Sequence, residues 1–466
     1  MTVVADQLGI GDLPWLAATI LRRSAHPLAG PAESLGIRPR YLRHKAGRDL
    51  VLTFAVPAPV EGRMTHGEES WGTLQLRGDQ VGRRLGFDRS AVLEADLTEP
   101  LPGVFEAGAV GARLQLFPAD PEMTALARCW GGEDGRVRTA LELAARQALG
   151  NPTLQLATCD AEAVRYKPGN RCVFRYRLGM TDPAHAGHRQ VTVFGKVYAD
   201  AGEAARVHQT VSRLFEGTSP ASPLPRPLGL DEEIGLVITE ALTPDSDAHR
   251  LERSRGGLSV PESELLHAAE ALSMLHASAS DRPAGDLADG REARRARERT
   301  AVLATSCPEL GGRLQRLGDQ LSRLLESEPP VVLRPVHGAM KPAHFFFSSG
   351  RTFLIDCDST RMADPAVDVG GFLAYLRPGG VWYGRQNSRA WFEAASQCFL
   401  SGYRQSMVML GIPDAEIDDC LRRSRLYEAS RLFKIAARRP NRLNSPRRGE
   451  LAAVCATVGR LLGPAS

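Results

Sequence analysis

Residues 331–370 read VVLRPVHGAMKPAHFFFSSGRTFLIDCDSTRMADPAVDVG. Short apolar runs in this stretch alternate with Gly, Ser and Pro residues, a pattern that is typical of short strands joined by turns. We therefore predict a compact strand-rich segment over residues 331–358. Helical patterns lie on both sides of it, so the second half of the chain is predicted to consist of helices around a small β-structure.

Apolar residues recur at helical spacing through much of this half. The first such pattern begins with Pro261, a residue favoured in the first turn of a helix. His276, near its end, is predicted to be a hydrogen-bonded packing residue. An Arg-rich stretch follows, in which we predict one or two amphipathic helices. The predicted helices cover residues 261–277, 291–327, 388–410, 414–438 and 448–462.

Two similar hairpins are predicted in the first half of the chain. Residues 42–56 and 164–178 each read as strand, turn, strand, with Lys, one further residue and Gly at the turn. Residues 113–120 (RLQLFPAD) then resemble residues 193–200 (VFGKVYAD), and each leads into an Ala-rich helical pattern. The matching order indicates either a duplicated small β-rich lobe or two unrelated hairpins with similar turn chemistry.

Composition marks two breaks before the helical half. Residues 131–135 (GGEDG) precede a helical pattern at 137–149, and Gly, Ser and Pro dominate residues 216–227. An apolar strand pattern follows at 235–240. These breaks predict three domains, over residues 1–150, 151–243 and 244–466.

The stretch 331–370 resembles the catalytic segment of the aminoglycoside phosphotransferases, choline kinases and maltokinases. Members of this family carry the pattern H-G-D-x-x-x-x-N, then a strand that ends in I-D, then G-D-P-x-x-D. The resemblance extends over roughly residues 160–400. It implies an α+β, bilobal, protein-kinase-like fold, here with an additional N-terminal β-rich domain. It also implies that ATP or another NTP and Mg²⁺ are the cofactors, and that a hydroxyl accepts the γ-phosphate.

The family pattern is only partly kept. His337 and Gly338 match, and the resemblance implies that they fix the backbone of the catalytic loop. Ala339 stands in the position of the catalytic Asp, and His344 in the position of the metal-binding Asn. Asp356 matches the principal magnesium ligand. The loss of a positioned base typically costs ~10²–10⁴ in rate, so the resemblance implies a slow enzyme or none.

The residues after this loop also match in part. Asp364 and Pro365 are kept, Ala363 replaces the Gly before them, and Asp368 matches a residue that usually accepts structural hydrogen bonds. Asp358 lies two residues beyond Asp356, so in a continued strand the two side chains would share a face. We therefore consider Asp358, together with His337, as a candidate catalytic residue, the alternative for Asp358 being a solvated loop position.

The first half supplies candidates for binding the nucleotide. The chain contains only five lysines, and Lys196 lies in an apolar strand pattern where a cation is costly without an anionic partner. By resemblance it contacts the phosphates, with Glu203 as its first candidate partner and Glu216 as the second. The turn at Lys167 is a candidate phosphate-covering loop. Glu240 lies where the family offers backbone groups to adenine.

Composition narrows the remaining possibilities. A net charge of +4 over 466 residues gives no electrostatic footprint for nucleic acid. No apolar run is long enough to span a membrane, and the start of the chain has no secretory pattern. The eight cysteines include no C-x-x-C pair. We therefore predict a cytoplasmic protein without a membrane or nucleic-acid partner.

Two functions remain open from the sequence. The first is an ATP-dependent kinase with weakened catalysis that acts on a small molecule, a sugar or a peptide. The second is a pseudokinase that binds a nucleotide or a protein partner without turnover, as Ala339 and His344 suggest. An engineered Asp-to-Ala change at position 339 is a third reading, but it would leave His344 unexplained.

Overall fold

The computed structural model describes residues 12–24, 37–43, 49–57, 69–77, 93–183, 185–218, 221–245, 248–278, 291–330, 332–378, 386–438 and 448–464. The chain divides into two compact units. Unit 1 takes in Met1–Arg206 and Leu228–Ala241, and unit 2 takes in Val207–Pro227, Leu242–Pro440 and Pro446–Ser466.

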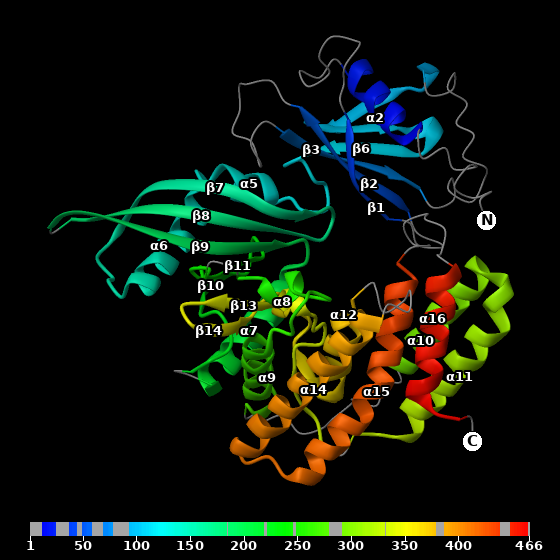
Figure 1. Ribbon diagram of the computed structural model, residues 1–466. Coiled ribbons are helices and arrows are strands. Elements are labelled where there is room, and N and C mark those ends of the chain that lie inside the picture. Colours follow the sequence, from blue (N-terminus) through cyan, green and yellow to red (C-terminus); the bar gives the residue numbers. More distant parts are fainter. Residues whose placement is uncertain are drawn as a thin grey trace. The chain divides into compact units, whose positions relative to one another are not determined.

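The N-terminal part of unit 1 is a six-stranded antiparallel sheet in the order β1-β2-β3-β6-β5-β4 (Figure 1). Helix α2 (Asp12–Arg23) covers it with an apolar face that includes Leu13, Leu16 and Ile20, all buried against the strands. A helix and a sheet that bury one face each against the other form a core of their own. The strands are β1 (Arg38–Arg43), β2 (Leu50–Pro57), β3 (Glu69–Leu76), β4 (Leu97–Leu101), β5 (Val104–Ala107) and β6 (Ala112–Leu116).

The second sheet of unit 1 has five strands in the order β10-β11-β9-β8-β7. Its three long strands form a meander, and β11 pairs antiparallel with β9 (Figure 1). The strands are β7 (Gln155–Lys167), β8 (Arg171–Asp182), β9 (His185–Tyr198), β10 (Pro227–Asp231) and β11 (Leu236–Glu240). Helices α5 (Leu126–Gly131) and α6 (Gly135–Leu149) precede the sheet, and α7 (Ala201–Thr218) begins after β9.

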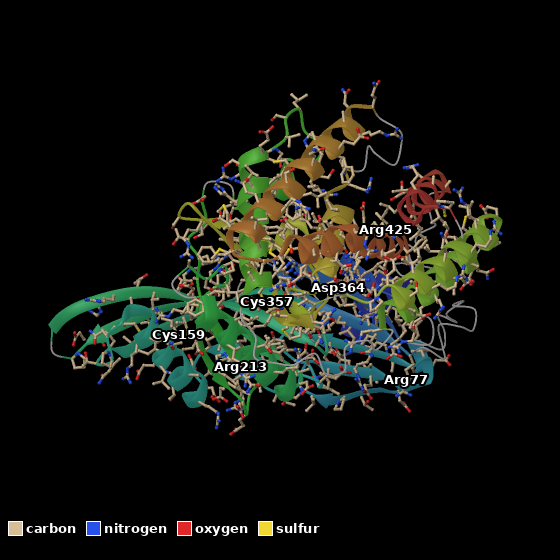
Figure 2. The ribbon with its side chains drawn as sticks, turned by 90° about the horizontal axis from the view of Figure 1, so that it is seen from below. Arg77, Cys159, Arg213, Cys357, Asp364 and Arg425 are labelled. Atoms are coloured by element: carbon tan, nitrogen blue, oxygen red, sulfur yellow. The ribbon has the colours of Figure 1, made fainter. Side chains whose placement is uncertain are left out.

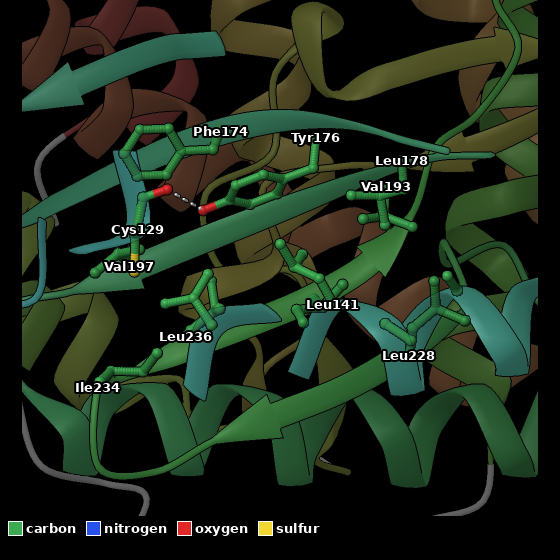
Figure 3. Close-up of a cluster of buried hydrophobic side chains, with 14 of the residues drawn as sticks. Cys129, Leu141, Phe174, Tyr176, Leu178, Val193, Val197, Leu228, Ile234 and Leu236 are labelled. Carbon is green, nitrogen blue, oxygen red and sulfur yellow. Dashed lines mark hydrogen bonds between the residues drawn. The ribbon is translucent and has the colours of Figure 1, made fainter. Parts of the chain in front are cut away.

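Helices α5 and α6 share a buried core with this second sheet (Figure 3). Tyr176 is fully buried there, and its hydroxyl donates a hydrogen bond of 3.0 Å to the carbonyl of Cys129 on α5. Gly195 lies beneath the same ring, and a Cβ at that position would come within 2.5 Å of Tyr176 Cε2. The glycine therefore lets β9 pass close to the tyrosine.

Alternation along β9 decides which side chains leave this core. Val193, Gly195 and Val197 are buried, while Phe194 and Lys196 between them are only partly covered. Successive side chains of a strand point to opposite faces. Lys196 therefore lies on the sheet face opposite to the α5–α6 core.

Unit 2 is mainly helical. Its helices are α8 (Arg250–Arg253), α9 (Glu262–Ala277), α10 (Arg291–Ser306), α11 (Gly311–Ser327), α12 (Ala366–Leu376), α14 (Gln386–Met409), α15 (Asp414–Ala436) and α16 (Arg448–Leu462). One buried cluster joins α10, α11, α15 and α16. Two small antiparallel pairs, β12 (Arg334–Val336) with β15 (Arg361–Ala363) and β13 (Phe345–Ser348) with β14 (Arg351–Leu354), carry the segment singled out in the sequence.

Most of the predicted elements are confirmed. The five predicted helical stretches form helices, with 291–327 split in two at Pro308–Leu310, and residues 331–358 carry short strands. The first hairpin has both of its strands, while its turn at 44–48 lies outside the described residues. The predicted α+β class and the additional N-terminal β-rich domain are confirmed. The domain limits at 150 and 243 stay predictions.

One predicted similarity is wrong. The sequence matched residues 113–120 to residues 193–200. In that match Leu116 would occupy the position in the first sheet that Lys196 occupies in the second. The strand β6 is the last strand of its sheet in sequence order, and it pairs with β3 and β5. The strand β9 is instead the third strand of a meander. The strand in the third position of the first sheet is β3, so topology does not support this pairing of positions.

All eight cysteines are free in this structure. Among the described residues, no helix combines the length and apolar character that crossing a membrane requires.

Candidate functional site

The loop between β12 and β13 is held by one buried carboxylate. Asp368, on the first turn of α12, accepts hydrogen bonds from the backbone N–H of His337 at 2.6 Å and of Gly338 at 2.8 Å. Asp368 is completely buried. The predicted role of this residue as a structural acceptor is therefore confirmed.

A histidine and a tyrosine complete this network. His276 on α9 approaches Asp368 with Nε2 at 3.3 Å, and its Nδ1 lies 2.7 Å from the hydroxyl of Tyr403. Burial by itself would raise the pKa of Asp368, but the hydrogen bond from His276 and the positive character of the two histidines lower it below its usual value. The carboxylate therefore stays ionised, and His276 is the hydrogen-bonded packing residue that the sequence predicted.

Gly338 matches the family glycine because the loop has no room for a side chain there. Its φ is +75°, and a Cβ would lie 2.2 Å from Arg361 Nη1 and 2.5 Å from the carbonyl oxygen of Ser359. Both the left-handed backbone and the close approach of β15 require glycine at this position.

His337 is buried, and its ring is bonded to the backbone. Nε2 donates to the carbonyl of Ile355 at 2.9 Å, which ties the loop to the residue before Asp356. These contacts are those of a residue that positions the loop. A direct catalytic role for His337 stays a prediction.

Asp356 adopts a left-handed conformation, with φ +63° and ψ +49°. It is one of two non-glycine residues with positive φ in the described part of the chain. This region costs an L-residue roughly 1–2 kcal/mol, and such strain persists only where the surroundings over-determine it, as they do at many functional sites. The backbone thus marks Asp356 as a position held for its side chain.

His344 meets Asp356 across the β13–β14 hairpin. The distance from His344 Nε2 to Asp356 Oδ2 is 3.6 Å, and the backbone N–H of Ile355 donates to the carbonyl of His344 at 2.9 Å. The ring of His344 also packs against that of His337, with centroids 4.8 Å apart. The loop therefore brings together the two residues predicted to hold the metal.

The expectation that Asp356 and Asp358 share a strand face is wrong. The strand β14 ends at Leu354, and Asp358 lies in the 3-10 turn Cys357–Ser359 that follows the left-handed residue. Asp358 is only 8% exposed, so it is not a solvated loop residue either. Its catalytic role stays a prediction.

Among the residues that the structure describes, no three His, Cys, Asp or Glu side chains gather as a metal site. The pair His344 and Asp356 can supply two ligands, and two ligands of one octahedral Mg²⁺ ion lie roughly 3 Å apart. A carboxylate is a preferred ligand of Mg²⁺, which usually takes its remaining oxygens from phosphates and water. Asp356 is therefore compatible with a cation shared with a nucleotide, while the imidazole of His344 is a weaker ligand for Mg²⁺ than an oxygen would be.

Asp364, a further match to the family pattern, is structural. It accepts two hydrogen bonds from the buried Arg423 on α15, from Nε at 3.0 Å and from Nη2 at 2.5 Å. Its other oxygen accepts the N–H of Ala366, the first residue of α12 (Asp364 is labelled in Figure 2). The pair fixes the start of the helix that carries Asp368.

In unit 1, Lys196 lies near the end of β9. It is paired in register with Val173 on β8 and Val237 on β11, and its ammonium lies 5.8 Å from the ring of Tyr198. Glu203 lies on the first turn of α7, and Glu240 is the last residue of β11. The predicted roles of these three residues at a nucleotide stay predictions.

The turn after Lys167 is bonded to a segment that the sequence did not connect with it. The N–H of Gly169 donates to Asp120 Oδ2 at 2.8 Å, and the hydroxyl of Tyr166 donates to the same oxygen at 2.7 Å. Burial and the neighbouring carboxylate raise the pKa of Tyr166, so the phenol keeps its proton. A phosphate-covering role for the Lys167 turn stays a prediction.

The sequence reasoning also missed a group of cations behind the catalytic loop. Arg299, Arg361, Arg431 and Lys434 all lie near Glu292. The available signal was Lys434, because lysine is rare in this chain. The aromatic run at 379–385, which we considered for substrate binding, lies outside the described residues.

Comparison with known proteins places this geometry in context. Residues 186–404 match the model of the family described as "Phosphotransferase enzyme family". This segment contains Lys196, the loop at His337, and Asp356. A search of curated protein sequences gives no match.

Several solved structures are similar to the chain. A glucosamine kinase in complex with glucosamine, ADP and inorganic phosphate is 17% identical, covers 96% of this chain and 99% of its own, and has a TM-score of 0.44. A choline/ethanolamine kinase family protein from Mesorhizobium loti is 17% identical over 69% of this chain and 92% of its own, with a TM-score of 0.37. Choline kinase LicA from Streptococcus pneumoniae is 14% identical over 70% and 99%, with a TM-score of 0.38.

The loop at His337, the strand that carries Lys196 and the strand that ends before Asp356 thus lie inside one matched segment. The predicted resemblance is confirmed: residues 186–404 match the model of the phosphotransferase enzyme family.

Proposed function

We propose that the chain is a nucleotide-dependent phosphotransferase that moves the γ-phosphate of ATP, or of another NTP, to a hydroxyl of a small molecule, a sugar or a peptide, with a weakened catalytic step. The observation that carries the proposal is the strained Asp356 facing His344 in a loop fixed by Asp368. Family membership supports the reaction class. The ordered loop supports a working site, because a family member under no functional constraint would have no need of it.

Each residue has a role in this proposal. Asp356 and His344 hold Mg²⁺, which neutralises the charge of the triphosphate when bound. Lys196 binds the phosphates, with Glu203 orienting its ammonium and the turn at Lys167 covering them. The backbone at Glu240 receives the base of the nucleotide.

The loop lacks a side chain that could act on the acceptor hydroxyl at position 339. Ala339 offers no group that can take a proton from the acceptor hydroxyl or orient it. Phosphoryl transfer depends mostly on positioning and on charge neutralisation, so the reaction proceeds slowly without this base. Asp358, which is buried two residues beyond Asp356, is the candidate replacement. His337 positions the loop through Ile355 and Asp368.

Binding of the nucleotide is tested with Asp356→Asn. Wild-type protein should show a rise in melting temperature with ATP and Mg²⁺, and the variant should lose it, because the cation loses its carboxylate ligand. Lys196→Met should lose it as well. Asp319→Asn, an exposed position on α11, is the matched control. A wild-type protein that ignores ATP with every divalent cation would exclude a nucleotide function.

The missing base is tested by Ala339→Asp. If the native site has lost its general base, the variant should turn over ATP faster by about 10²–10⁴ when an acceptor is present. Release of ADP in a coupled assay measures this. Unchanged turnover would mean that another group, with Asp358 as the first candidate, already does this work.

A pseudokinase remains the second candidate because Ala339 and His344 stand at the catalytic and metal positions. In that case the protein binds a nucleotide or a protein partner and transfers nothing. Nucleotide binding without ADP release, in the wild type and after restoration of Asp at position 339, would favour it.

A further inference from the structure

Four cations of unit 2 lie around Glu292. They are Arg299 on α10, Arg361 on β15, and Arg431 and Lys434 on α15, and we name them the basic cluster. The charge of Glu292 acts on all four of them. Groups from every neighbouring element also act on the cluster: Arg291 and Arg295 on α10, Asp368 and Tyr375 on α12, and Arg438 on α15.

Arg431 lies almost wholly inside unit 2. Its residue is only 6% exposed, and the described part of the chain gives its guanidinium neither a hydrogen bond nor an ion pair. The ammonium of Lys434, one helical turn further along α15, likewise has no such contact among the described residues. Arg431 is largely buried and Lys434 is half-buried, and cations in such positions without a counter-ion are disfavoured, so this arrangement needs an explanation.

Glu292 does not balance the cluster. Its Oε1 is already bonded to Arg299 Nη1 at 2.8 Å and to Ser430 Oγ at 2.6 Å. Asp368, the other acid nearby, has both oxygens bound by the backbone of the catalytic loop. Positive charge therefore exceeds negative charge around Arg431.

The basic cluster adjoins the catalytic loop on both sides of Ala339. A Cβ on Gly338 would lie 2.2 Å from Arg361 Nη1. A Cβ on Gly371 would lie 3.3 Å from the carbonyl oxygen of Met340 and 3.7 Å from both Nε and Nη2 of Arg431. Arg361 thus approaches Gly338 directly, and Gly371 lies next to both Met340 and Arg431.

We propose that the basic cluster binds an oxyanion, a phosphate or carboxylate group, and that this group belongs to the acceptor. The second half rests on the proposed phosphotransferase function, whereas the anion site stands without it. Arginine guanidinium groups bind such oxyanions in pairs of charge-assisted hydrogen bonds. An acceptor held by this group would present its hydroxyl close to Ala339, where the family places the group that orients it.

The state of Lys434 supplies a readout. Burial, and then the charges of Arg431 and Arg299, lower the pKa of Lys434 from 10.5 to about 7. An anion in the cluster would raise this pKa again, because it favours the charged ammonium. Binding at pH 8 should therefore draw a proton from the buffer.

The site is tested by calorimetric titration of the full chain with inorganic phosphate at pH 8, at constant ionic strength, in two buffers of different ionisation enthalpy. We expect one saturable site and proton uptake in the wild type. Arg431→Met should weaken phosphate binding by about tenfold or more. Arg422→Met, an exposed position on the same helix, should leave it unchanged.

A second variant guards against misfolding of the first. Lys434→Met should bind phosphate more weakly and take up no proton. The absence of saturable binding in the wild type would overturn the anion site, and so would binding that both cluster variants leave intact.

The acceptor half is tested with pairs of acceptors that differ by one charged group, such as a neutral hexose and its monophosphate. We expect the anionic member to be phosphorylated more efficiently, and Arg431→Met to remove its advantage. A preference for the neutral member, in a protein that still binds phosphate, would overturn this half and leave a site for a free anion. If none of the acceptors causes release of ADP while phosphate binding is intact, this result would count against the proposed function and leave the anion site standing.

Discussion

Asp368 shows how much one side chain decides here. It holds two backbone N–H groups of the catalytic loop and one histidine, all in a site that excludes water. The sequence predicted its role because it stands at a matched position of the family pattern. The partner His276 was predicted only as a packing residue, because sequence alone cannot pair residues 92 positions apart.

Asp368→Asn should destabilise the protein by about 3 kcal/mol at neutral pH, because an amide cannot accept all three hydrogen bonds as a carboxylate does. The folded pKa of Asp368 is lowered, so its stabilisation is fully present above the usual Asp value near 3.8 and is lost as the pH falls through the lower folded value. Denaturant unfolding of both proteins from pH 7 downward measures this. The difference between them should shrink below pH 4, and a constant difference would contradict the assignment.

The residue that sequence reasoning misplaced is Asp358. A period of two assumes that the strand continues, but the left-handed turn at Asp356 ends the alternation after Leu354. Nothing in the local residue types announces positive φ at an aspartate. The basic cluster was missed for a related reason: arginines in an amphipathic helical pattern read as solvated, and only tertiary packing makes Arg431 a buried residue.

At the scale of elements, α15 fixes the start of α12 through Arg423 and Asp364. Both side chains are buried, and the arginine donates two hydrogen bonds to one carboxylate oxygen. The helix limits were predictable from apolar spacing, and the predicted stretch 414–438 is close to the observed Asp414–Ala436. The pairing of the strands was not predictable, because the sequence of a short strand does not indicate which strands it pairs with. For this reason residues 113–120 were matched to the wrong strand.

Arg423→Met should cost about 3–5 kcal/mol, because it leaves the Asp364 carboxylate buried without its cation. Adding Asp364→Asn should recover part of that loss. Urea unfolding of the two single variants and the double variant gives the coupling free energy. Arg425→Met, which removes a partly exposed pair with Glu328 on the same helix, serves as the control and should cost about 1 kcal/mol or less. Additive losses in the double variant would show that the two residues do not act as a pair.

At the scale of the whole molecule, the two units have separate buried clusters. The cluster of α10, α11, α15 and α16 contains residues of unit 2, while the sheet around Tyr176 belongs to unit 1. The amino-acid pattern predicted a strand-rich first part and a helical second part. The division of unit 1 into two sheets with two cores depends on which strands pair over long distances in the sequence. The periodicity of apolar residues carries no information on that pairing.

Leu321→Ala, in the middle of α11, should destabilise unit 2 by about 2–5 kcal/mol by leaving a cavity in its core. Hydrogen exchange read by peptide should then lose protection in α10, α11, α15 and α16. The strands β7, β8 and β9 should keep theirs, since regions with separate cores open separately. Equal loss of protection in both units would mean that they unfold as one.

The carboxylate of Asp120 gives the Lys167 turn a property that a hairpin of this length does not have alone. Gln115 donates to the hydroxyl of Tyr166, and Tyr166 and Gly169 both donate to Asp120. These four groups link the end of the first sheet and the segment after it to the tip of the second hairpin. A loop ordered in this way loses little freedom when a ligand docks against it, because its conformation was set during folding. Stiffness at the tip of the second hairpin is thus supplied by a stretch of chain that the family match, beginning at residue 186, does not include.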